Sequence, residues 1–394
     1  MNNIITYVGE FKDRTFEEMP FNEVDSLVLC QLSYLNFEGY VEGPDEYSTP
    51  VLLKDIYESG NIDSLFSAYW YKRENRDLIT QVAQSKRYEG MMLNYYVQIF
   101  NEEDDTQFSA VTYILPDKSI FIAYRGTDAT LIGWKEDMLL AYSKPLKSQE
   151  LSTQYLNKVS HFVSGKLKIG GHSKGGNLAV YAAMFCHRDV RDRLSDIFDH
   201  DGPGFRPEIV RAGKFIEIQD RIHKYIPRFS IVGIILEDDI DYDVVECWSV
   251  GALQHNSYMW KSKDGRFIRS RGMTSKKKIQ DASLNEWIYS LSEEEVGVFV
   301  DSLFDILTAS DRKTLYDLLA DPGGTMQSAF KTIIDMDKKT KDCILEIVVR
   351  LMDIYKGNAL EDFLYRTRAL KEEMKQWQLE ASAHIPVKKN REKL

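Results

Sequence analysis

The chain has little cysteine and no long apolar run. Its four cysteines lie far apart with no C-x-x-C spacing, so we expect buried free thiols and neither a metal site nor a disulfide framework. No stretch approaches the roughly 20 apolar residues that span a bilayer. Residues 1–11 have no basic start and no apolar core, so we expect no secretory leader, no transmembrane segment and a cytoplasmic location.

Basic charge is also scarce. The chain has 50 Lys and Arg against 61 Asp and Glu, and this net charge of −11 argues against nucleic-acid binding, which needs a broad basic face. Its 394 residues, 43% of them hydrophobic, can form a substantial core in one large domain with a smaller one beside it. We expect a soluble globular protein.

The most informative motif is G-x-S-x-G over residues 171–175. An apolar run over 167–169 precedes it, and small residues typical of a closely packed helix follow it. Strand, sharp turn and helix in this order expose a serine hydroxyl, and the two glycines let the backbone double back. We interpret Ser173 as a nucleophile; a purely structural turn is the alternative.

The rest of the pattern alternates strands and helices. Strands are predicted over 93–100, 108–115, 119–124, 197–200, 215–226 and 242–248, and helices over 22–35 and 149–163. This order indicates an α/β fold on which the helix over 22–35 docks. The aromatic segment over 38–88 either caps the core, which we favour, or covers a pocket.

A serine hydroxyl needs a base, and a histidine held by a carboxylate serves best. Of seven histidines, only His255 lies in a loop after the last predicted strand and downstream of the serine. Its position matches the order Ser, acid, His of the α/β-hydrolase fold. We interpret His255 as the base; a surface or packing histidine is the alternative.

Two stretches offer the acid. Asp201 follows the strand after the serine helix, and Gly202-Pro203 predict a sharp exit there. Most enzymes of this fold carry the acid one strand later, where residues 225–228 have no aspartate. We favour Asp201 over the acidic run that follows, which comprises Glu237, Asp238, Asp239 and Asp241. The structural alternative for Asp201 is capping of backbone amides at its turn.

Ester hydrolysis also needs donors for an oxyanion. The amide of Lys174, directly after the serine, is one candidate. The amide of Thr127, with its hydroxyl, is the second, because Thr127 follows the strand over 119–124. An ordinary glycine turn over residues 125–128 is the alternative.

Several blocks of the chain resemble class 3 (fungal-type) lipases. They are Tyr124–Asp128, Gly133–Asp137 and Gly170–Ala179. With Asp201–Phe205, Ser230–Gly233 and Gln254-His255, the chain more closely resembles the Mbeg-like family, lipase-related bacterial proteins of largely unknown function. The resemblance covers residues 15–260. It implies an α/β-hydrolase core with Ser173 as nucleophile, His255 as base and Thr127 at the oxyanion position.

One departure from the class 3 pattern concerns the acid. Those lipases carry it before a Val-Pro pair that matches Ile226-Pro227, where this chain has His223 and Lys224. An aspartate after the earlier strand, followed by Gly-Pro, resembles the arrangement of pancreatic-type lipases. This resemblance favours Asp201.

The chain changes character after residue 260. Eight Lys and Arg face the single acid Asp264 over 261–278, which we interpret as a solvated linker; a patch for anionic lipid head groups is the alternative. Ser283–Glu286 and Ser292–Glu295 match capping boxes. The predicted divisions are a hydrolase domain with its docking helix (1–260), a basic linker (261–279), an all-helical C-terminal appendage (280–382) and a basic tail (383–394).

Together these features predict a serine esterase or lipase that cleaves a carboxylic ester through an acyl-enzyme, without a cofactor. The substrate is then a small-molecule or lipid ester, any membrane contact is peripheral, and the appendage offers a surface to a protein partner. A catalytically inactive hydrolase-fold protein that binds through its appendage is the second hypothesis. Acyl chain length, ester against amide preference and oligomeric state stay open.

Overall fold

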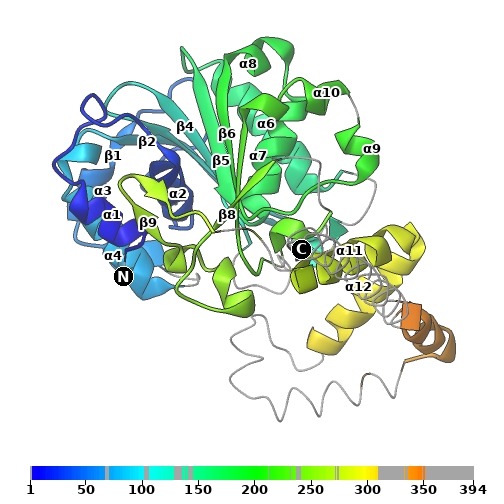
Figure 1. The fold of residues 1–394 in the computed structure, drawn as a ribbon. Coiled ribbons are helices and arrows are strands. Elements are labelled where there is room, and N and C mark those ends of the chain that lie inside the picture. The colour runs from blue at the N-terminus through cyan, green and yellow to red at the C-terminus, as the bar shows by residue number, and fades with distance from the viewer. Residues whose placement is uncertain are drawn as a thin grey trace, which may run out of the picture.

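An eight-stranded sheet forms the centre of the computed structural model (Figure 1). The structure describes residues 2–66, 71–101, 106–127, 135–137, 139–140, 145–211, 213–230, 232–236, 241–270, 272, 275–308, 332, 336–347 and 349–350. The strands follow chain order: β1 (Val51–Leu52), β2 (Met92–Asn101), β3 (Thr106–Ile114), β4 (Ile120–Tyr124), β5 (Leu167–His172), β6 (Leu194–His200), β7 (Ile222–Pro227) and β8 (Tyr242–Val245). Pairing is antiparallel from β1 to β4 and parallel from β4 to β8. The predicted α/β organisation is confirmed in this form.

The connecting helices cover one face of the sheet. They are α6 (Lys147–Ser160), α7 (Lys174–Phe185), α8 (Arg188–Arg193), α9 (Pro207–Val210) and α10 (Gly213–Ile216), with the short 3₁₀ helix η3 (Gln219–Arg221). Connections between parallel strands are nearly always right-handed, so strands added in one direction place their helices on the same side. Figure 1 shows these helices on one side of the sheet. Tyr155, Leu178 and Ile169 belong to the apolar core between them and the sheet.

The opposite face is covered by the beginning and the later part of the chain. It carries α1 (Ile4–Glu10), α2 (Glu23–Leu32), α3 (Leu53–Glu58), α4 (Lys72–Ala83), η1 (Ile62–Phe66), η2 (Lys86–Tyr88) and the hairpin of β9 (Ser262–Lys263) and β10 (Arg266–Phe267). Val24 of α2 packs in one core with Phe121 and Phe198 of the sheet. The helix predicted over 22–35 therefore forms α2 and docks on the sheet.

A buried ion pair joins the elements of this face. Arg87 donates to both carboxylate oxygens of Asp25, at 2.8 and 2.5 Å, and both side chains are fully buried. The hydroxyls of Tyr7 and Tyr88 also donate to Asp25, at 3.1 and 2.6 Å. A buried charge is tolerated when its lone pairs are satisfied in this way.

The strand predicted over 215–226 is wrong in its first half. Residues 213–216 form α10, and only Ile222–Pro227 form a strand. Phe215 and Ile218 are both buried and lie three residues apart, a helical spacing that apolar content alone does not reveal. The strand predicted over 242–248 ends early, at Val245.

Two long helices follow the sheet domain. They are α11 (Ser275–Ser290) and α12 (Glu293–Thr308), and they pack against residues 139–140 and 235–236 in a third apolar cluster. Asn285 ties α11 to the domain, because it accepts from the amide of Leu236 at 2.9 Å and donates to the carbonyl of Ile234 at 2.7 Å.

The two predicted capping boxes behave differently. Ser292 and Glu295 exchange hydrogen bonds of 2.8 and 3.2 Å, so this box caps α12 as predicted. Ser283 and Glu286 lie inside α11, and their prediction as a cap is wrong because the helix already begins at Ser275. Most of the predicted appendage beyond residue 308 and the basic tail lie outside the described residues.

Part of the basic segment is packed rather than solvated. Residues 262–267 form the β9–β10 hairpin, whose Phe267 is buried in the core beside α2. Arg269 pairs with Glu23 and Asp243, at 2.8 Å each. These contacts correct the expectation of a solvated linker for this stretch.

All four cysteines are free, as predicted. Cys30 and Cys186 are buried, whereas Cys247 and Cys343 are half-buried rather than buried. Within the described part of the chain, no helix combines the length and apolar character that crossing a bilayer requires.

Candidate active site

Ser173 occupies the single residue between β5 and α7. Its backbone has φ 60° and ψ −133°, a region that residues with side chains rarely adopt. A Cβ on Gly171 would collide with the backbone of Gly175, and a Cβ on Gly175 with the carbonyl of Tyr124. The two motif glycines are therefore required for this turn, which holds the serine hydroxyl at the carboxyl end of β5.

His255 and Asp201 lie in line with Ser173. Nε2 of His255 lies 3.0 Å from Oγ of Ser173, and Nδ1 of His255 lies 2.6 Å from Oδ2 of Asp201. Because the carboxylate accepts a hydrogen bond from Nδ1–H, Nε2 of the neutral imidazole carries no proton and can accept the hydrogen bond of the serine hydroxyl. The structure thus joins the three residues singled out in the sequence in one hydrogen-bonded chain.

Asp201 is held at a second strained turn. It follows β6 with φ 56°, and its amide donates to the carbonyl of Tyr225 at 2.8 Å. The hydroxyl of Ser230 donates to its other carboxylate oxygen, Oδ1, at 2.5 Å and accepts from the amide of Gly233 at 2.9 Å. Ser230 lies in one of the family-like blocks, but nothing in the sequence indicated this role.

The alternatives for the acid do not reach His255 in the described residues. Asp241 precedes β8 and lies beside Ile222 and His223, at the amino ends of the parallel strands. His255 and Ser173 lie at the opposite, carboxyl edge. Glu237, Asp238 and Asp239 lie outside the described residues. The amide of Gly202 at the Asp201 turn donates to Asp199 at 2.8 Å, so Asp199 caps that amide.

Thr127 lies beside the serine, after β4. A Cβ on its neighbour Gly126 would lie 3.1 Å from the Cβ of Ser173. The hydroxyl of Thr127 donates to Oδ2 of Asp137 at 2.5 Å, so its single proton is already engaged. The amide of Lys174 is the first of α7, and the first amides of a helix have no acceptor within it. The backbone amides of Lys174 and Thr127, rather than the Thr127 hydroxyl, are therefore the candidate donors to an oxyanion.

The side chain of Lys174 forms a buried ion pair that the sequence did not predict. Its Nζ lies 2.8 Å from Oε2 of Glu136 and 3.0 Å from the carbonyl of Gln107. The Lys174 and Glu136 side chains are only 1% and 3% exposed. This pair fixes the segment that carries Asp137, whose pKa burial raises to about 6.

His172 supports the loop that carries His255. Its Nε2 lies 2.9 Å from the carbonyl of His255, and its Nδ1 lies 3.2 Å from the hydroxyl of Tyr34. Burial, with the nearby His255 ring, holds the pKa of His172 well below its usual range. A neutral imidazole fits both contacts: Nε2–H donates to the carbonyl and Nδ1 accepts from the tyrosine. Sequence reasoning passed over His172 as part of the turn.

A family model described as Mbeg1-like matches residues 82–305. Among solved structures, a crystal structure of M37 lipase matches with 13% sequence identity and a TM-score of 0.35, covering 54% of this chain and 70% of that one. No curated protein matches.

Proposed function

The chain belongs to the Mbeg1-like family, as its motifs indicate, and from this premise and the site geometry we propose that it is a serine hydrolase that cleaves carboxylic esters. One observation carries the proposal: the hydrogen-bonded chain Ser173–His255–Asp201, whose serine lies on a strained strand-to-helix turn. The order of these residues after β5, β6 and β8 supports an α/β-hydrolase fold.

The proposed reaction follows from the positions of these atoms. Oγ of Ser173 attacks the ester carbonyl carbon while Nε2 of His255 takes its proton. The amides of Thr127 and Lys174 donate to the tetrahedral oxyanion. The intermediate collapses, His255 returns the proton to the departing alcohol, and an acyl-serine remains. Water, deprotonated by His255, then releases the acid and restores the serine.

Asp201 orients the imidazole and stabilises the imidazolium that forms in both steps. Its complete burial and its second donor, Ser230, keep its carboxylate directed at Nδ1. The second hypothesis, an inactive binding protein, is favoured if no carboxylate holds the histidine, and the 2.6 Å contact between Asp201 and His255 weakens it. A protein partner for the appendage stays a prediction.

Labelling with a fluorophosphonate probe tests the proposal. We expect stoichiometric modification of Ser173 in the wild type, none in Ser173→Ala and little in His255→Ala, read by mass spectrometry of the modified peptide. His223→Ala is the matched control. His223 also pairs with an aspartate, but it lies near the amino end of β7, whereas Ser173 follows the carboxyl end of β5. This variant should label like the wild type.

Two results would contradict the proposal. One is the absence of labelling under conditions that modify a known serine hydrolase. The other is equal hydrolysis of short acyl esters by wild type and Ser173→Ala. Either result would favour the binding protein.

A further inference from the structure

Large apolar side chains are exposed close to the proposed base. Among the described residues, Val250 is 75% exposed, Leu253 69%, Trp248 48% and Phe229 36%. We call these four residues the apolar rim. The side chain of Gln254 joins its two segments, because it accepts from the amide of Phe229 at 2.9 Å and donates to the carbonyl of Ser249 at 2.8 Å.

The apolar rim and the candidate active site are adjacent in the chain. Leu253 and His255 belong to the same short helix, η5 (Gly251–His255). The His255 side chain is 26% exposed, whereas Ser173 is 7% exposed and Asp201 is fully buried. His255, which shares η5 with Leu253 of the rim, is therefore the most exposed of the three residues. Grouped exposed apolar side chains of this kind mark surfaces that contact another phase or molecule.

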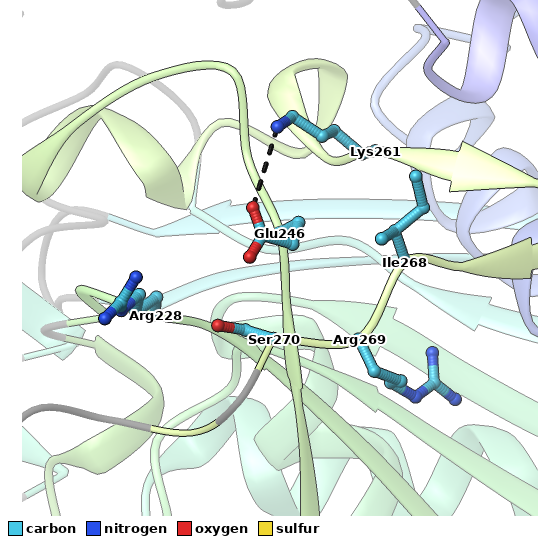
Figure 2. A pocket seen from close by; sticks show the side chains of 6 residues that line it. All are labelled: Arg228, Glu246, Lys261, Ile268, Arg269 and Ser270. Carbon is cyan, nitrogen blue, oxygen red and sulfur yellow. Dashed lines mark ion pairs between the residues drawn. The ribbon is translucent and has the colours of Figure 1, made fainter.

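Cations accompany the apolar rim. The guanidinium carbon of Arg228 lies 5.9 Å from the ring centre of Phe229, and Nζ of Lys261 lies 4.5 Å from that of Trp248. Both residues line one cavity of about 360 Å³, together with Glu246, Ile268, Arg269 and Ser270. Figure 2 shows Arg228, Lys261 and Arg269 around the single carboxylate of Glu246.

The cavity keeps positive charge after its ion pairs are counted. Lys261 pairs with Glu246 at 3.6 Å, and Arg269 pairs with Glu23 and Asp243 outside the cavity lining. Within the described residues, no carboxylate pairs with Arg228. An anionic group can therefore bind beside Arg228 without displacing an existing partner.

We propose that the apolar rim, with Arg228 and Lys261, docks on an anionic lipid bilayer, and that the ester substrate is a lipid presented there. This inference rests on the hydrolase function proposed above. Tryptophan and aliphatic side chains partition into the bilayer interface, and neighbouring Lys and Arg contact anionic head groups. A net charge of −11 repels an anionic bilayer from most of the surface, so the local cations select the face that approaches.

Vesicle co-sedimentation of the full chain tests the docking surface. The protein carries Ser173→Ala so that lipid is not consumed, and vesicles contain phosphatidylcholine alone or with phosphatidylglycerol. We expect binding to the anionic vesicles that weakens with added salt. Val250→Asp with Leu253→Asp should abolish binding, and Arg228→Gln should weaken it about fivefold, the effect of removing one charge near an anionic surface.

Matched controls lie elsewhere on the molecule. Ile216→Asp in α10 changes a side chain that is 58% exposed, and Arg188→Gln in α8 removes an exposed charge. Both should bind like the parent. If thermal unfolding shows that the double aspartate variant is unfolded, Val250→Ser alone should still lower binding severalfold.

The outcomes separate this inference from the proposed function. No binding to any vesicle, equal binding to neutral and anionic vesicles, or equal loss in Ile216→Asp and the rim variants would overturn the docking surface. Wild type that hydrolyses a soluble short ester but ignores vesicles keeps the function and loses this inference. Wild type that binds anionic vesicles but hydrolyses no ester keeps the docking surface and loses the function. If the rim binds a protein instead of a bilayer, neither the parent nor any variant should bind vesicles.

Discussion

Two histidine–aspartate pairs lie at opposite ends of the same sheet. Near the amino ends of β6 and β7, Nε2 of His223 lies 3.0 Å from Oδ1 of Asp196, with the side chains 39% and 31% exposed. At the carboxyl end, Nδ1 of His255 lies 2.6 Å from a fully buried Asp201. A hydrogen bond between imidazole and carboxylate therefore does not by itself mark a site.

The backbone distinguishes the two pairs. Ser173 and Asp201 both have positive φ, at 60° and 56°, whereas neither Asp196 nor His223 does. Such conformations persist where the surrounding fold imposes them, often where they aim a functional group. At the carboxyl end they bring a hydroxyl within 3.0 Å of the imidazole. Of the two histidine–aspartate pairs, only the one at the carboxyl end therefore combines a strained, buried aspartate with a strained serine within reach of the imidazole.

The largest predicted effect is the difference in kcat/KM between variants of the two aspartates. Asp201→Asn should lower kcat/KM for a short ester about 10⁴-fold, because the imidazole loses the carboxylate that sets its tautomer and stabilises the imidazolium. Asp196→Asn, the same change at the amino end, should leave kcat/KM within twofold. Steady-state kinetics measure both variants. Similar losses of kcat/KM would contradict the claim that only the aspartate at the carboxyl end takes part in catalysis.

The second prediction concerns His200, the residue before Asp201. Ser26 donates its proton to the carbonyl of Glu23, so Nε2–H of His200 donates to Ser26 Oγ at 2.8 Å. Burial lowers the pKa of His200 to about 3. Above pH 6.5 the imidazole is neutral in both states. As the pH falls from 6.5 towards 3, only the unfolded chain takes up the proton, and the free energy of unfolding falls.

The total loss from this histidine is up to about 5 kcal/mol. His200→Gln should lack this part of the acid dependence. Urea unfolding of both proteins at several pH values measures it, and identical slopes between pH 6.5 and 3 would contradict the prediction.

The third prediction concerns Asp137, another carboxyl group at the carboxyl end. Its pKa is raised from 3.8 to about 6 by burial, so the fold favours the protonated form. As the pH rises through 3.8 to 6, the unfolded chain releases the proton first, and the free energy of unfolding falls by up to about 3 kcal/mol. Asp137→Asn, which still offers Thr127 an acceptor, should therefore gain stability relative to wild type between pH 4 and pH 7. An unchanged difference between these pH values, measured by denaturant unfolding, would contradict this prediction.

The smallest predicted effect on activity concerns the serines that donate hydrogen bonds to the two aspartates. Ser230→Ala removes the second donor to Asp201 and should lower kcat about tenfold, the usual value of a hydrogen bond to a charged group, with KM little changed. Ser230→Thr should restore most of the activity. Ser195→Ala is the matched change beside Asp196, whose pKa is lowered first by the His223 hydrogen bond and also by Ser195. It should not alter the kinetics, so equal effects of the two alanine variants would remove the distinction.

Local patterns explain how much could be predicted. Alternating strands, a small-residue helix and paired glycines indicate the α/β sheet and the turn at Ser173, and chain order singles out His255. Asp201 is favoured by the Gly-Pro that follows it and by the resemblance to pancreatic-type lipases, while the acidic run after β7 stays open. The supporting contacts carry no such signal. Lys174 resembles a surface lysine in the sequence, and its partners Gln107 and Glu136 come from segments that lie far from it along the chain.

The same holds for His172 and Ser230, whose partners come from distant elements. Tyr34 follows α2, and Asp201 follows β6, so neither contact is visible in a local window. The α10 helix was missed for a different reason: a short apolar stretch fits strand and helix equally well, and the packing of Phe215 and Ile218 decides between them.

The strand order also determines when each face of the sheet can be completed during synthesis. Beside α6 and α7, each strand and its helix emerge consecutively and can pack at once. The helix α2 is made early, and besides α1 and α4 its partners are β4 to β6 and, later still, Trp260 and Phe267. The part of its surface that packs on these later elements stays uncovered on the ribosome until they follow. Contacts of such long sequence separation slow folding, so this face should mature last and depend most on chaperones.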